Sequence, residues 1–311
     1  MIGRGGGGVV FRAADRRFPD GVALKFTLTG AVGQHKAARE AAIMQKVRHP
    51  HVCELLEHRC FESAGIFGLA LELMNAGTLT ERLAQHGGKL AQAEVVGVVF
   101  EMLLALKHVH GQEIVHRDVK PSNILRHIRA GPDGVEVVVH KLANFGIAVA
   151  ASNAAGSPSA IMMTSTVGLQ AQVGTPVYMS PEQFKPGAVA GPATDIWSLG
   201  VVMHQALTSQ LPFAHDEQAD LYAVGAAVMR DEPPDVRDLT EPGTVDDKVA
   251  ELVLKALHKP ADERFSSAAA MSTALEAALG SSAEEACDVF LKCRVWCEKG
   301  LLPRSSRPCR P

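Results

Sequence analysis

Apolar residues recur along the chain at two spacings, and each spacing predicts a different kind of element. Residues 34–47 are rich in Ala, Glu and Lys with apolar positions at helical spacing, which predicts a helix. Residues 91–110 predict a second helix, whose broad apolar face is made of Val95, Val98, Val99, Met102, Leu103 and Leu106. Residues 22–25 alternate as a strand does, and residues 69–74 form a short apolar run that predicts a buried strand.

Two other segments are defined by turn residues and by the absence of periodicity. Pro132, Asp133 and Gly134 mark a turn, so the apolar run over 135–142 predicts a strand that returns from it. The preceding residues 126–134 are interpreted as an insertion at a hairpin tip, which costs little free energy. Residues 148–172 are rich in Ala, Ser, Thr and Gly without periodicity and predict a long loop.

Length, charge and hydropathy narrow the class of protein. With 311 residues, 47% of them hydrophobic, the chain can bury the core of one large domain or of two lobes. Its net charge of −3 provides no general attraction to nucleic acid or to an anionic membrane, so neither is expected as a partner. The longest apolar stretch is interrupted by Gly97 and Glu101 and is too short to span a bilayer, and the N-terminus lacks a signal-peptide pattern. We therefore expect an intracellular, cytoplasmic location.

The six cysteines do not follow a metal-binding pattern. Four of them lie in the last 25 residues, at spacings that fit no paired C-x-x-C zinc motif. Free thiols in a reducing compartment are the simpler interpretation.

Residues 116–123, with the sequence HRDVKPSN, combine the side chains needed for phosphoryl transfer. Asp118 can accept a hydroxyl proton, Lys120 can neutralise a transferring phosphoryl group, and Asn123 can hold a metal ion. This octet resembles the catalytic loop of protein kinases.

The N-terminal glycines fit G-x-G-x-x-G-x-V, with Gly3, Gly5 and Gly8 in the glycine positions and Val10 in the last. Glycines let the backbone approach phosphates closely, although a run of glycines also fits a flexible terminus. The strand that follows resembles the V-A-I-K motif of kinases. That resemblance implies that Lys25 holds the α- and β-phosphates of ATP and that Ala23 packs on the adenine.

Further resemblances complete the implied nucleotide site. Glu40, on the first predicted helix, is in the position of the glutamate that pairs with the strand lysine, although a solvated helix charge would look the same. The run over 69–74 resembles the kinase hinge, and a plain core strand and turn would look identical. The adenine-binding positions implied there and after the catalytic loop are Leu71, Glu72, Met74 and Leu125.

One position departs from the family pattern. Kinases carry Asp-Phe-Gly where this chain has Asn144, Phe145 and Gly146, and the missing Asp is the residue that holds Mg²⁺. One unit charge near a cation is worth about 4 kcal/mol at an effective dielectric of 20. Loss of that charge corresponds to a decrease of about 10³-fold in reaction rate or in metal affinity. We therefore expect a weakened Mg²⁺ site made of Asn123 and Asn144.

Several later positions also match kinases. The segment 174–182 resembles G-T-x-x-Y-x-A-P-E, and Thr175 together with Lys120 implies Ser/Thr rather than Tyr specificity. Asp195 is expected to hold the backbone of the catalytic loop. Arg264 is the expected partner of Glu182.

Regulation and substrate preference are less well defined by the sequence. Arg117 resembles the residue that captures a phosphate placed on the loop by an upstream kinase, and the candidate hydroxyls are Thr164, Ser165, Thr166 and Thr175. Each of these hydroxyls could equally be a plain solvated loop residue. Gln205, where kinases directed to basic substrates resemble one another in carrying Glu, gives no indication of an Arg preference.

The resemblance implies a two-lobed α+β fold over residues 1–279, with a small β-rich lobe to about residue 75 and a larger helical lobe after it. Residues 280–311 are interpreted as a basic, disordered tail, in which a helix over 284–296 is an alternative. The leading interpretation is a Ser/Thr protein kinase that uses ATP and Mg²⁺ on protein hydroxyls. The alternative is a pseudokinase that binds nucleotide or acts as an allosteric scaffold.

Overall fold

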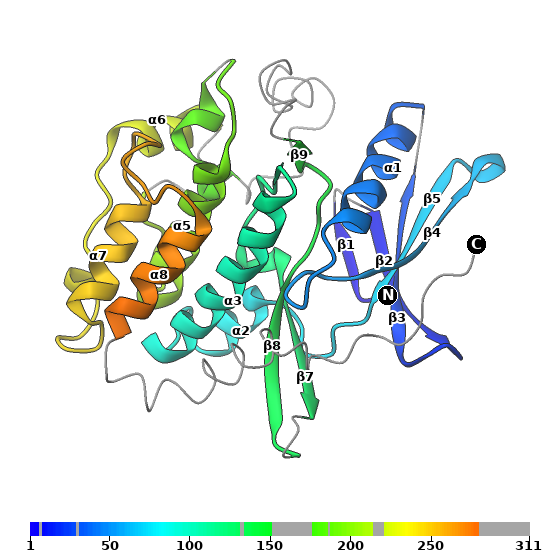
Figure 1. The fold of residues 1–311 in the computed structure, drawn as a ribbon, viewed down its shortest axis with the longest axis horizontal. Coiled ribbons are helices and arrows are strands. Elements are labelled where there is room, and N and C mark those ends of the chain that lie inside the picture. The colour runs from blue at the N-terminus through cyan, green and yellow to red at the C-terminus, as the bar shows by residue number, and fades with distance from the viewer. Residues whose placement is uncertain are drawn as a thin grey trace.

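The structure is a computed structural model, and it describes residues 1–5, 8–28, 31–130, 134–150, 176–185, 187–213 and 221–279. These residues form the predicted two-lobed α+β fold, with a β-rich lobe and a helical lobe side by side (Figure 1). The loop hydroxyls Thr164, Ser165, Thr166 and Thr175, and the tail from residue 280, lie outside the described residues. The division into lobes at residue 75 and a separate tail stays a prediction.

The small lobe is an antiparallel sheet of five strands in the order β1-β2-β3-β5-β4, with helix α1 against it (Figure 1). Side chains alternate across β3, so Ala23 and Lys25 share one face. The elements are β1 (Gly3–Gly5), β2 (Gly8–Asp15), β3 (Phe18–Leu28), α1 (Ala31–Lys46), β4 (Leu55–Phe61) and β5 (Ile66–Glu72).

The large lobe is built around α3 and α5, whose buried faces meet the shorter helices. Trp197 on α5 is fully buried and stacks on Phe213 with ring centroids 5.4 Å apart. Helix α2 begins at a capping box, in which Thr78 and Glu81 each bond the other's backbone N–H. The helices are α2 (Leu79–Gln85), α3 (Gln92–Gly111), α5 (Pro192–Thr208), α6 (Leu221–Arg230), α7 (Asp247–Ala256) and α8 (Ala268–Leu279).

Short elements connect the helices and strands. Strand β6 (Ile114–Val115), just before the catalytic loop in the sequence, pairs with β9 (Val149–Ala150), which follows Asn144, Phe145 and Gly146. The single 3₁₀ turns are η1 (Glu62–Ala64), η2 (Pro121–Asn123), η4 (Pro176–Tyr178), η5 (Pro181–Phe184) and η6 (Val236–Leu239).

A hairpin of β7 (Ile124–Ala130) and β8 (Glu136–Leu142) projects from the large lobe (Figure 1). The segment interpreted as an insertion at the hairpin tip begins within β7, which continues in register with β8 through Ala130. The Asn75 side chain bonds both backbone groups of Ile128, at 2.9 and 2.7 Å. The hairpin therefore braces the segment that joins the lobes.

The other predicted elements agree with the structure to within about three residues. The helices predicted over 34–47 and 91–110 are α1 and α3, and the strands predicted over 69–74 and 135–142 are β5 and β8. Within the described part of the chain, no helix combines the length and apolar character needed to cross a membrane.

Candidate active site

The strand lysine and the helix glutamate form the ion pair predicted from the sequence. Lys25 Nζ lies 2.7 Å from Glu40 Oε1, and both side chains are buried, at 11% and 8% exposure. A buried pair of this kind is costly to break, because the remaining charge would lose its partner. The contact therefore fixes α1 against the sheet.

The catalytic-loop side chains converge on Asp118, which is 8% exposed. Lys120 Nζ lies 2.9 Å from Asp118 Oδ1. Asn123 donates from Nδ2 to Asp118 Oδ2 at 2.8 Å and to the Asp118 backbone carbonyl at 2.7 Å. The carboxylate is thus held between an ammonium and an amide, and its orientation is set by both.

Asn144 connects these two groups. Its Nδ2 donates to Asn123 Oδ1 at 3.3 Å, and its Oδ1 accepts from Lys25 Nζ at 3.5 Å. Its backbone has φ 69°, a conformation that Asn tolerates better than most residues. A continuous series of polar contacts therefore runs through Glu40, Lys25, Asn144, Asn123, Asp118 and Lys120.

The same geometry fits a hard divalent cation poorly. Mg²⁺ takes oxygen ligands and usually at least one carboxylate. Asn144 directs an amide N–H, and not an oxygen, at Asn123, so the two side chains satisfy each other. In the described part of the chain, no three or more His, Cys, Asp or Glu side chains are grouped so as to hold a metal ion.

Asp195 on α5 holds the backbone of the catalytic loop, as predicted. Its carboxylate accepts from the N–H of His116 at 2.9 Å and of Arg117 at 2.7 Å. His110 Nε2 also contacts it at 2.8 Å, a partner that no sequence motif indicated. Burial alone would raise the pKa of Asp195, but the hydrogen bond from His110 and the neighbouring donors outweigh it and lower that pKa.

His116 links the catalytic loop to the segment that carries Asn144. Its Nδ1 accepts from the N–H of Asp118 at 3.2 Å, so Nε2 is the donor to the Ala143 carbonyl at 3.1 Å. The ring meets Phe145 edge-on with centroids 4.8 Å apart. Burial lowers the pKa of His116, which keeps the ring neutral.

The predicted nucleotide-binding residues come from both lobes. In the small lobe, Val10 lies opposite Lys25, and Ala23 lies opposite Leu71. Gly3 and Gly5 pair with Val10 and Gly8 at the sheet edge. In the large lobe, Leu125 on β7 forms a bridge with Thr78, just before α2.

Gly8 is a position where only glycine fits. Its φ is 120°, and a Cβ added there would collide with the backbone carbonyl of Phe26.

The two expected hinge positions, Glu72 and Met74, have different surroundings. Glu72 ends β5, and its carboxylate pairs with Lys141 at 2.7 Å, whereas Met74 follows the strand and is half-buried. The adenine contacts expected of the Glu72 and Met74 backbones stay a prediction.

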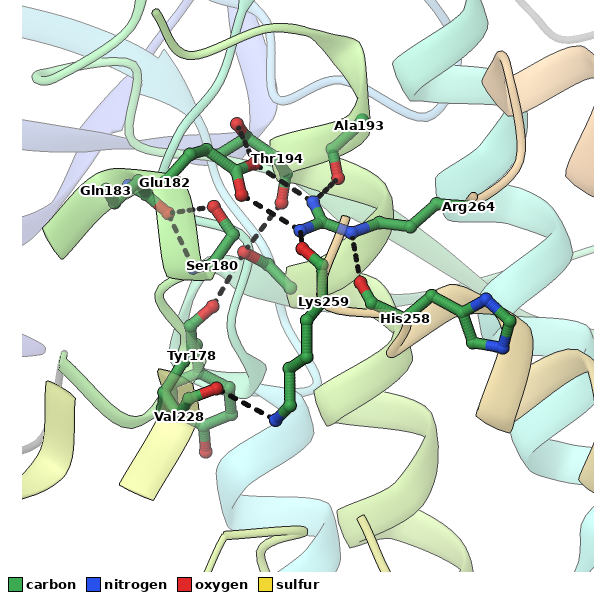
Figure 2. A network of polar contacts seen from close by, with 11 residues as sticks. Tyr178, Ser180, Glu182, Gln183, Ala193, Thr194, Val228, His258, Lys259 and Arg264 are labelled. Carbon is green, nitrogen blue, oxygen red and sulfur yellow. Dashed lines mark hydrogen bonds and ion pairs between the residues drawn. The ribbon is translucent and has the colours of Figure 1, made fainter. Parts of the chain in front are cut away.

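The predicted pair of Glu182 and Arg264 is present and lies in a wider network (Figure 2). The guanidinium donates to both carboxylate oxygens of Glu182 at 2.9 Å. Its other N–H groups bond the backbone carbonyls of Ala193, His258 and Lys259. Burial alone would raise the pKa of Glu182, but the bonds from Arg264 outweigh it and lower that pKa.

This fold and site define the class of protein. The family model described as "Protein kinase domain" matches residues 1–275, and the chain belongs to that family.

Two curated bacterial relatives are named as serine/threonine-protein kinases. The chain is 31% identical over 284 residues to the serine/threonine-protein kinase pkn3 of Myxococcus xanthus, covering 89% of this chain and 48% of that protein. It is 31% identical over 296 residues to the serine/threonine-protein kinase PknD of Mycobacterium tuberculosis, covering 94% of this chain and 41% of that protein. The chain therefore spans about half the length of these relatives, or less.

Proposed function

We propose that this chain transfers the γ-phosphoryl group of ATP to Ser or Thr hydroxyls of a protein. The observation that carries the proposal is the series of contacts from Glu40 through Lys25, Asn144 and Asn123 to Asp118. It brings a phosphate-binding cation and a proton acceptor into one cleft. Serine/threonine-protein kinases among the relatives support the substrate class.

Each residue has a separate role in the proposal. Asp118 orients the incoming hydroxyl and accepts its proton, and Lys120, 2.9 Å from it, steadies the charge of the transferring group. Lys25, held by Glu40, binds the α- and β-phosphates. Bound ATP supplies the phosphoryl group, and the glycines of β1 and β2 leave room for its phosphates.

Activation by an upstream kinase forms part of the proposal. Arg117 is half-buried, and its Nε has no hydrogen-bond partner among the described residues. Burial lowers the pKa of Arg117, and the charge of Arg39 adds to this effect. A phosphate on one of the candidate hydroxyls Thr164, Ser165, Thr166 or Thr175 would give the Arg117 guanidinium an anionic partner.

One specific observation favours the alternative function, a pseudokinase. The Asn144 amide donates to Asn123 Oδ1 at 3.3 Å, so the two residues expected to hold the metal ion bond each other directly. Such a cleft can bind nucleotide and present a fixed lobe arrangement to a partner while transferring slowly or not at all. The weakened Mg²⁺ site is common to both functions.

Phosphate transfer to a generic protein substrate distinguishes the two functions. We would compare the native chain, Asn144→Asp and Asp118→Ala, each with Mg²⁺ and with Mn²⁺. We expect low native activity, its loss in Asp118→Ala, and a gain of up to about 10³-fold with Mg²⁺ in Asn144→Asp, because the added carboxylate attracts the cation.

Nucleotide binding is measured on the same proteins as a control. ATP should raise the melting temperature of the native chain and of Asp118→Ala, but much less that of Lys25→Met, which lacks the phosphate-binding cation. Native transfer no greater than that of Asp118→Ala, together with normal ATP binding, would favour the pseudokinase. Absence of ATP binding would contradict the kinase and a nucleotide-binding pseudokinase, and would leave only a pseudokinase that acts as an allosteric scaffold.

A further inference from the structure

A cluster of four histidines lies where the segment between α1 and β4 meets the large lobe. His49 and His51 belong to that segment, His108 to α3 and His140 to β8. The ring of His49 stacks on that of His108 with centroids 5.1 Å apart. His51 Nδ1 lies 3.0 Å from the backbone carbonyl of His140. The histidine cluster therefore joins a segment of the small lobe to two elements of the large lobe.

The same segment is bonded to β8 through its backbone. The N–H of Leu142 donates to the His51 carbonyl at 2.8 Å, and the N–H of Cys53 donates to the Leu142 carbonyl at 2.9 Å. Helix α1, which carries Glu40, ends three residues before the first histidine of the cluster, and β8 ends two residues before Asn144. Release of the segment would therefore loosen the helix that positions Glu40 from the strand that leads to Asn144.

His49 holds the turn of this segment through a ring nitrogen that must stay unprotonated. Its Nδ1 accepts from the backbone N–H of His51 at 3.2 Å. A neutral imidazole carries one proton, so the proton of His49 is on Nε2, and a second proton can be added only to Nδ1. That proton would turn the acceptor into a donor, and two N–H groups would face each other. Protonation of His49 therefore breaks the bond that shapes the segment.

The titratable groups that act on His49 are all basic. They are His51 on the same segment, His108 on α3 and Lys141 on β8. Burial, together with these groups, lowers the pKa of His49 to about 3. While the segment is in place, the ring therefore stays neutral at pH values where a solvated histidine is protonated.

The carboxylates of this region already have partners. Glu101 on α3 accepts from His140 Nδ1 at 2.6 Å and from the His140 N–H at 2.8 Å, and it lies 3.8 Å from His51 Nδ1. Burial lowers the pKa of His51 as well, although Glu101 opposes this effect. Two further carboxylates lie beside cations, in the pairs Glu72 with Lys141 and Glu54 with Arg48. None of the three is left to offset a charge on His49.

We propose that the histidine cluster is an acid-sensitive latch, which holds the segment between α1 and β4 against β8 while His49 is neutral and releases the segment and α1 on acidification. A released His49 regains a pKa of about 6.5, so the released state takes up a proton that the latched state does not. The ratio of released to latched chains should therefore rise about tenfold between pH 7.5 and pH 5.5. Under the proposed function, acid would then disconnect Glu40 from the nucleotide site without unfolding the large lobe.

Hydrogen exchange of the full chain, followed by mass spectrometry at pH 7.5 and pH 5.5, tests the latch. Peptides that cover residues 47–55 report on the N–H groups of Val52 and Cys53, which donate to the carbonyls of His49 and Leu142. After correction for the intrinsic exchange rate at each pH, the protection of these peptides should fall about tenfold at pH 5.5. Peptides of α1 should lose protection with them, and peptides of α3 should stay better protected than both.

His49→Asn separates the titration of the ring from its role as an acceptor. The Asn side-chain oxygen can accept from the N–H two residues further on, as His49 Nδ1 does, but it does not titrate. This variant should keep its protection over residues 47–55 at both pH values, and His49→Gln is a second variant without a titratable ring. His49→Ala, which has no acceptor, should lose protection at both. His86→Asn replaces an exposed histidine after α2 and should behave as the native chain does.

A tenfold loss of protection in the native chain that is absent from His49→Asn and His49→Gln would support the latch. An equal loss in the native chain and in these two variants would overturn it, because another group would then be responsible. Protection that does not change with pH in the native chain would also overturn it. So would a loss in which α3 falls to the same level as residues 47–55, since the whole lobe would then be unfolding. No phosphate transfer is measured, so these results leave the proposed function to its own test.

Discussion

Replacing Arg264 by Ala should be among the most destabilising single changes in the large lobe. The Arg264 side chain is fully buried and makes five hydrogen bonds, two to Glu182 and three to backbone carbonyls (Figure 2). Removing it takes both guanidinium bonds from the Glu182 carboxylate, which keeps the bond from the Thr194 hydroxyl, and leaves the three carbonyls without the guanidinium. The guanidinium also lies over Trp197, 4.9 Å from the ring centroid, so packing is lost as well.

The size of the effect follows from these contacts. At a net value of about 1 kcal/mol for each hydrogen bond, the five bonds amount to about 5 kcal/mol. This agrees with the range of about 3–5 kcal/mol for breaking a buried ion pair by removing one partner. Since 1 kcal/mol shifts the melting temperature of a domain of 150–250 residues by about 2–4 °C, we expect a decrease of about 10 °C.

Thermal and urea unfolding, followed by circular dichroism, would measure the change. Arg264→Lys tests geometry, because an ammonium keeps the charge but cannot form the two parallel bonds to Glu182, and it should recover less than half of the loss. Arg237→Ala is the matched control. Arg237 also bonds two carboxylates, those of Asp235 and Asp247, but it is exposed, so its removal should leave the transition close to that of the native protein.

Two results would refute this reasoning. Equal decreases in the melting temperature of Arg264→Ala and Arg237→Ala would mean that burial does not make the contacts of Arg264 more stabilising than those of Arg237. Native-like stability of Arg264→Lys would mean that charge alone, and not the paired hydrogen bonds, is responsible.

Three further perturbations test other parts of the structure. Burial lowers the pKa of His49 to about 3 and also lowers the pKa of His51, so the unfolded chain binds more protons than the folded one. In urea titrations the free energy of unfolding should therefore be complete above about pH 6.5 and fall below it, by about 1 kcal/mol at pH 5.5 from His49 alone. Gly8→Ala should raise the ATP dissociation constant, measured by calorimetry, about tenfold, because the added Cβ meets the Phe26 carbonyl. Gly111→Ala is the control and should leave that constant unchanged, because a Cβ at Gly111 has no atom within 4 Å. Asn75→Ala should lower the unfolding free energy by about 1–2 kcal/mol through the loss of two hydrogen bonds to Ile128.

Much of the site was predictable because its residues occur in ordered motifs. The pairs Lys25 with Glu40 and Glu182 with Arg264 were both expected, and both are present at hydrogen-bonding distance. Asp195 also binds the loop backbone as expected. These contacts depend on the fold as a whole, so the resemblance that predicted the fold also predicted them.

Other features depend on details that no motif encodes. The extension of β7 through Ala130 is set by its register with β8, a pairing between segments whose local sequence also suited a loop. His110 reaches Asp195 because of where α3 ends, and the amide of Asn144 is oriented by Asn123 and Lys25 together. Orientation of side chains within a cleft is decided by all the neighbours at once, which the sequence pattern does not specify.

The brace between Asn75 and the β7–β8 hairpin has a mechanical consequence. Both backbone groups of Ile128 are bonded to one side chain, and the N–H of Arg126 bonds the Gly77 carbonyl at 2.8 Å, so the chain from residue 75 onward moves with the large lobe. Leu73 and Met74 are the two residues between β5 and this braced segment, so a rotation of one lobe against the other would have to change their backbone dihedrals. Because Met74 is also an expected adenine contact, such a rotation would be sensitive to what is bound there.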